Sequence, residues 1–77
     1  MDLTYDAEAD AAYMTLGGPI APGQAAQQIH SLATPGNRGE VTLDFDAEGR
    51  LLGVEVLNAS AVLAPDLLDG AGPPGPG

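Results

Sequence analysis

Residues 40–57 constrain the fold of this chain more than any other segment. Apolar and polar residues alternate in VTLDF at 41–45 and in LGVEV at 52–56, on either side of the run DAEG at 46–49. An alternation with period two is typical of β-strands that bury one face. Gly49 ends the intervening run, where a turn often requires a left-handed conformation that glycine adopts without steric cost. We therefore predict an antiparallel hairpin.

The register of this hairpin follows from the faces of its strands, because a slip of one residue turns every core side chain to water. With a four-residue loop at 46–49, Leu43 faces Leu52 on an apolar side. In the same register Val41 faces Val54. A three-residue loop would mix apolar and polar residues on both faces. We therefore predict the four-residue loop, with a polar second face formed by Glu40, Thr42, Asp44 and Glu55.

Three further strands are expected before the hairpin. Residues 3–5 and 11–16 alternate in the same way, and Asp6 is suited to start an Asx-type turn between them. Residues 17–24 are rich in Gly and Pro and predict a loop. The composition of residues 25–32 is compatible with a helix or a strand, since Ala and Gln favour helices while the flanking turns favour hairpins. We predict a strand. The Pro-Gly pair within 34–39 predicts the turn that leads into the hairpin.

A short helix is expected directly after the hairpin. Residues 58–64 are mostly small and apolar, and Asn58 or Ser60 would supply a side-chain cap. The hairpin leaves Leu51 and Leu57 on its polar face. We expect the helix to cover these two leucines.

The C-terminal part of the chain is expected to be ordered up to Asp69 and disordered after it. Pro65 would begin or interrupt the last helical turn, and Leu67 and Leu68 would dock on the sheet. Residues 70–77 are only Gly, Ala and Pro and predict a disordered tail. We therefore expect one small α+β domain over residues 1–69, with an antiparallel sheet of four or five strands and a short C-terminal helix.

The charge of the chain restricts its partners. Eleven Asp and Glu stand against only Arg38 and Arg50, which gives a net charge of −9. Such a surface repels phosphate backbones and anionic membranes, so we expect neither nucleic acid nor membrane as a partner. The chain starts without a basic and apolar leader and has no run of about 20 apolar residues, which predicts a cytoplasmic location.

The small core indicates a protein partner. Burial of apolar surface stabilises a fold by about 25 cal/mol per Å². In a domain of this size, the total stabilisation from burial only slightly exceeds the free-energy cost of ordering the chain. The chain has no cysteine, which excludes disulfides, thiolate catalysis and Cys-type metal sites. We therefore expect stabilisation by a second subunit.

Three segments resemble a known family: LTYD at 3–6, ADAAYMTL at 9–16 and VTLDFDAEGRLLGVEVLNAS at 41–60. Their distinctive features are the spacing Tyr-Asp-x-x-x-Asp-x-x-Tyr from Tyr5 and the pattern Asp-x-x-Gly-x-x-x-Gly-x-Glu-x-Leu from Asp46. They resemble the short bacterial proteins grouped as domain of unknown function 2283. The resemblance implies a compact β-rich domain but no activity, substrate or catalytic residue. Residues 17–39 depart from it toward Ala, Gln, Pro and Gly.

Two acidic clusters are candidate metal-binding sites. Asp44, Asp46, Glu48, Gly49 and Glu55 have the spacing of an EF-hand calcium loop. An EF-hand needs flanking helices, whereas these flanks alternate as strands, and a hairpin accounts for the glycine without an ion. The second cluster of carboxylates, which a solvated turn also explains, consists of Asp6, Glu8 and Asp10.

The remaining candidate functional residues are explained more simply by a structural role. His30 is the only histidine, so any metal site there would need acidic residues for every other ligand. Ser31 and Ser60 lack the Gly-x-Ser-x-Gly context of a nucleophile. Tyr5 and Tyr13 suit either an aromatic contact surface or core packing, and we expect core packing.

We therefore expect a non-enzymatic interaction module without cofactor, metal or catalytic residues, which self-associates as a dimer or binds another protein. Its surplus apolar residues support this expectation and are Leu51, Leu57, Leu67 and Leu68. The alternative is a Ca²⁺- or Mg²⁺-binding protein or small enzyme that uses the acidic hairpin loop.

Overall fold

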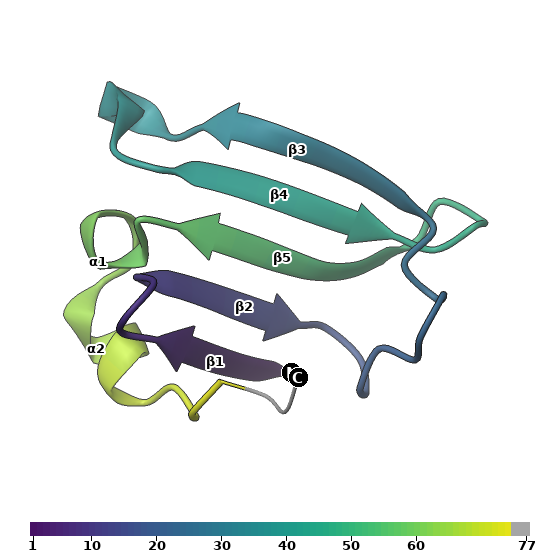
Figure 1. Cartoon of the computed structure of the whole chain (residues 1–77), viewed down its shortest axis with the longest axis horizontal. Helices are drawn as coiled ribbons and strands as arrows, with labels where there is room; N and C mark the ends of the chain where they lie inside the picture. Colours follow the sequence, from purple (N-terminus) through teal and green to yellow (C-terminus); the bar gives the residue numbers. More distant parts are fainter. Residues whose placement is uncertain (75–77) are drawn as a thin grey trace.

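A five-stranded antiparallel sheet forms the body of the computed structural model, which describes residues 1–74. The strands lie in the order β1-β2-β5-β4-β3, so β1 and β3 form the two edges (Figure 1). The α+β class and the antiparallel sheet predicted from the sequence are confirmed. The elements are β1 (Asp2–Asp6), β2 (Ala11–Thr15), β3 (Gln27–Ala33), the 3-10 turn η1 (Pro35–Asn37), β4 (Glu40–Phe45), β5 (Leu51–Leu57), α1 (Ala59–Val62) and α2 (Pro65–Asp69).

The β4–β5 hairpin has the predicted faces but not the predicted register. Leu43 lies opposite Val54 rather than Leu52, and Val41 opposite Val56 rather than Val54. A shift of two residues preserves the alternation of faces, so the sequence pattern does not distinguish the two registers. The loop spans 46–50 instead of the expected 46–49, which accounts for one residue of the shift, and an irregularity between Asp44 and Phe45 accounts for the other. Gly49 adopts the expected left-handed conformation, with φ of 83°.

Opposite residues of paired strands share a face, so the pairing aligns side chains into rows that cross the whole sheet. Two rows on one face are apolar apart from the Tyr5 hydroxyl, and we call this the apolar face. The first row consists of Leu3, Met14, Val54, Leu43 and Ile29. The second row consists of Tyr5, Ala12, Val56, Val41 and Leu32.

A β-bulge in β3 brings its two large apolar side chains onto this face. Ile29 and Leu32 are three residues apart, whereas their partners Leu43 and Val41 are two apart. A regular strand would place residues three apart on opposite faces. The extra residue of the bulge restores the match, and Ser31 within it has a φ of 61°.

Both helices lie at one end of the sheet, beside β5, β2 and β1 and away from β3 (Figure 1), and their apolar residues pack on the apolar face. The buried core consists of Ala12, Val56 and Ala59. Three helical or flanking residues pack against it, namely Val62, Leu63 and Leu68. Neither helix is long enough to cross a membrane, and this holds for all the residues described.

Several details around the helices differ from expectation. Leu51 and Leu57 remain exposed instead of lying beneath a helix, because α1 packs on the apolar face whereas Leu57 pairs with Glu40 on the other. Leu68 docks as predicted but Leu67 faces solvent. Pro65 begins α2. Neither Asn58 nor Ser60 caps α1 with its own side chain.

Part of the segment expected to be a disordered tail follows the outer edge of β1. The Gly72 amide donates to the Leu3 carbonyl over 2.9 Å, and the Tyr5 amide donates to the Gly72 carbonyl over 3.0 Å. Glycine permits this close backbone approach. Residues 75–77, to which the same expectation applied, lie outside the described part.

Candidate functional site

The first apolar row is the least covered part of the apolar face. None of its five members is buried, although the second row contains Ala12 at 1% and Val56 at 7% exposure. Exposure is greatest at β3, where Ile29 is 50% and Leu32 42% exposed. The helices therefore cover the second row at its β1–β2–β5 side, whereas the first row is only half-buried and the β3 residues are exposed.

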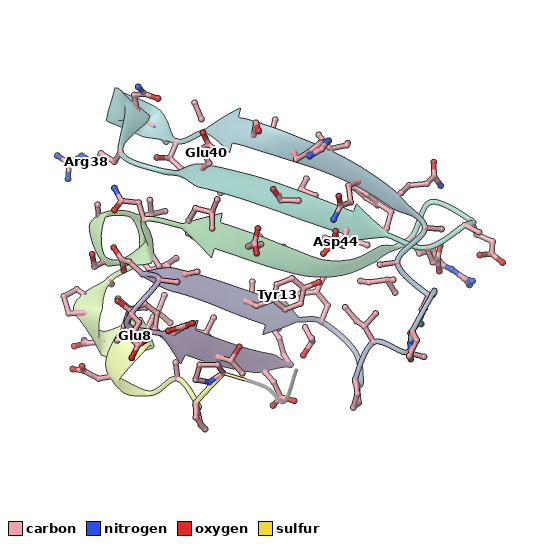
Figure 2. The ribbon with its side chains drawn as sticks, viewed as in Figure 1. Glu8, Tyr13, Arg38, Glu40 and Asp44 are labelled. Carbon is pink, nitrogen blue, oxygen red and sulfur yellow. The ribbon has the colours of Figure 1, made fainter. Side chains whose placement is uncertain are left out.

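A hydrogen-bonded trio holds the opposite, polar face together. The Tyr13 hydroxyl donates to Asp44 Oδ2 over 2.6 Å, and Gln28 Nε2 donates to Asp44 Oδ1 over 2.6 Å. Figure 2 shows the Tyr13 side chain reaching from β2 across β5 toward Asp44 on β4. Burial first, and then the bond to Asp44, raises the pKa of Tyr13 far above its usual range. The hydroxyl therefore stays protonated as a donor, and the trio joins three strands.

Gly53 makes room for that tyrosine. A Cβ at this position would overlap the Tyr13 hydroxyl and would lie 2.7 Å from its Cζ. Glycine in the interior of a strand often marks such a close approach. The Gly53 of the sequence pattern thus serves the packing of Tyr13 and not a ligand.

Asp10 connects the β1–β2 turn to α1. Its carboxylate accepts the Ser60 amide over 2.9 Å, the Ser60 hydroxyl over 2.7 Å and the Tyr5 hydroxyl over 2.7 Å. Its own carbonyl accepts the amide of Ala59. The bonds from Ser60 and Tyr5 lower the pKa of Asp10. Asp10 thus caps α1 from a turn fifty residues earlier in the chain.

The acidic residues with EF-hand spacing do not converge. Asp44 points to Tyr13, whereas Asp46 Oδ1 accepts the amides of Glu48 and Arg50 inside the loop. These bonds, chiefly that of the Arg50 amide, lower the pKa of Asp46. Glu55 lies in the middle of the polar face, opposite Thr42 and Tyr13. Within residues 1–74 no group of three or more potential ligands is placed to hold a metal ion.

The second acidic cluster is a turn, as its simpler reading predicts. Asp6 Oδ1 accepts the amides of Glu8 and Ala9 over 3.0 and 3.4 Å. Glu8 projects from this turn (Figure 2). Asp10 faces the other way, toward α1.

The single histidine and the two serines are also separated. His30 and Ser31 lie exposed in β3, and Ser60 lies on α1. Ser60 donates to Asp10 and so does not cap α1 itself. No catalytic pairing among these three is present in the described residues.

The two tyrosines do not form a shared aromatic surface. Tyr5 packs against the core on the apolar face, as predicted, whereas Tyr13 lies on the polar face.

We did not predict from the sequence that the edge strand β3 exposes large apolar side chains. The signal for this was the pair Ile29 and Leu32, whose spacing fits one face of a strand only if the strand is bulged.

A family model described as "Protein of unknown function (DUF2283)" matches residues 2–60. The matched region runs from β1 into α1 and contains the whole sheet. The searches of curated proteins and of solved structures found no match.

Proposed function

The chain belongs to the DUF2283 family of proteins of unknown function, and from that premise we propose that it is a non-enzymatic interaction module that self-associates as a homodimer. The observation that carries the proposal is the first apolar row, which crosses all five strands without one buried member. Its half-buried side chains continue into the exposed Ile29 and Leu32 of β3, and apolar surface left uncovered in this way is typical of interaction sites. We also propose that residues 1–69 form one domain and that the protein is cytoplasmic.

The surface of the chain supports the need for a partner. The isolated chain of 7.7 kDa exposes 5054 Å², whereas a compact monomer of that mass exposes about 4300 Å². The chain thus exposes about 700 Å² more surface than a compact monomer of its mass, as expected of a sheet whose apolar face is only partly covered.

The polar groups support an interaction role over catalysis. Tyr13, Asp44 and Gln28 are bonded to one another, and Asp46 is occupied by its own loop. Catalytic carboxylates and nucleophiles instead lie within reach of a partner and a substrate cavity. The hydrogen bonds of this chain hold strands and turns together.

The test is the mass of the protein in solution, by sedimentation or light scattering at micromolar concentration. We expect twice the mass of the 7.7 kDa chain, and a monomer for Ile29→Lys. Leu57→Lys is the matched control, since Leu57 is also exposed, at 38%, but lies on the polar face opposite Glu40. A wild-type monomer at these concentrations would overturn the proposal. A thermal shift on adding Ca²⁺ or Mg²⁺ would instead favour the metal-binding alternative.

A further inference from the structure

We propose that the two copies pack sheet against sheet through their apolar faces, which leaves the acidic faces on the outside of the dimer. This inference rests on the proposed function, because it assigns the surface and geometry of that self-association. The occupant of the apolar face is thus a second copy of the same chain. Three features support it: the distribution of charge, the state of the two sheet edges and the extent of the open row.

The carboxylates of the sheet all lie on one face. Five strand residues are acidic, and each belongs to a row on the polar face: Asp2, Asp6, Glu40, Asp44 and Glu55. The two apolar rows contain no charged residue. Two chains of net charge −9 repel each other most where carboxylates meet. Of the two faces of the sheet, the apolar face is therefore the one whose strands bring no carboxylates together when two copies meet.

Both sheet edges are protected against strand addition. Gly72 hydrogen-bonds along the outer side of β1. The β3 edge carries a bulge with Ser31 in a left-handed conformation, which interrupts a regular ladder. Natural sheets use bulges and covering segments to prevent edge-to-edge pairing. The open surface is therefore the apolar face and not an edge.

The open row extends well away from β3, which distinguishes the two geometries. Met14 lies on β2, and two strands, β5 and β4, separate it from the β3 edge. Packing of one sheet on another buries residues in the interior of a sheet, whereas edge pairing leaves them unchanged. Met14 is only half-buried within one chain. It is therefore the residue that reports on sheet-against-sheet packing.

The native chain offers a direct experiment. It contains two methionines, and Met1 is 83% exposed outside the sheet. With ¹³C-methyl methionine, we expect the Met14 methyl signal to shift as the protein is diluted through dimer dissociation. The Met1 signal is the internal reference and should shift less than that of Met14, because Met1 lies outside the rows, beside Leu3. A dimer by mass whose Met14 signal does not change on dissociation would overturn this geometry and leave the proposed function standing.

A pair of variants on β2 provides the second measurement. Met14→Lys places a charge on the apolar face, whereas Thr15→Lys places the same charge on the polar face, in the row of Asp2. Burial of an unpaired charge in an interface should raise Kd by about a hundredfold for Met14→Lys. Thr15→Lys should change Kd by less than about threefold. Equal effects of the two variants, with both proteins folded by circular dichroism, would also overturn the sheet-against-sheet arrangement.

Discussion

At the scale of single residues, the polar face depends on Tyr13. Its ring covers Gly53 and its hydroxyl reaches Asp44, which is 7% exposed. A carboxylate with so little access to water depends on protein donors, because the loss of one leaves an acceptor without a bond. Tyr13 therefore contributes through a donor as well as through its ring.

Tyr13→Phe separates these two contributions. The variant keeps the ring over Gly53 and removes only the donor to Asp44, so we expect the free energy of unfolding to fall by about 1.5–3 kcal/mol. Urea denaturation of both proteins measures the difference. Tyr5→Phe is the matched control, since it removes the same group from the more accessible carboxylate of Asp10 and should cost less. Equal losses in the two variants would contradict the importance of burial at Asp44.

At the scale of elements, the predictable features are those that alternation encodes. The faces of β4 and β5 follow from their period of two, but a shift of two residues keeps the same faces, so Leu43 pairs with Val54 without any sign in the pattern. The bulge of β3 leaves a trace in the spacing of Ile29 and Leu32. The capping of α1 by Asp10 leaves no trace in the sequence pattern, because the two residues in contact are fifty positions apart. Local pattern thus predicts strands and faces, whereas contacts between distant segments need the folded structure.

The contact between Asp10 and α1 makes a prediction about pH. Hydrogen bonds from Ser60 and Tyr5 lower the pKa of Asp10 from its ordinary value of 3.8. A lowered pKa in the folded state means that the ionised carboxylate stabilises the fold above about pH 4, and that this contribution disappears as the pH falls through the folded value. Asp10→Asn tests it, since Asn tolerates the left-handed backbone, with φ of 51°, at this position.

We expect Asp10→Asn to unfold at lower urea concentration than the wild type between pH 5 and pH 8. The gap between their midpoints should narrow as the pH falls below about 4, because the wild-type carboxyl then loses its charge. Urea midpoints at several pH values measure it. A gap that stays constant down to pH 2 would show that the ionised carboxylate does not cap α1.

At the scale of the whole molecule, charge and apolar surface oppose each other. Each chain has a net charge of −9, so a dimer brings together two strongly acidic subunits around an uncharged contact. The apolar face favours association and the like charges oppose it. The balance between the two depends on salt.

Added NaCl should therefore strengthen the proposed dimer. The Debye length falls from about 30 Å at 0.01 M to about 3 Å at 1 M, so repulsion between the subunits is screened. We expect Kd to fall on the order of tenfold over this range, as measured by sedimentation equilibrium. The double variant Glu8→Gln, Glu48→Gln removes two charges from turns remote from the rows and should show a shallower dependence. A Kd that rises with salt would mean that ion pairs through Arg38 or Arg50 hold the subunits together, and not the apolar face.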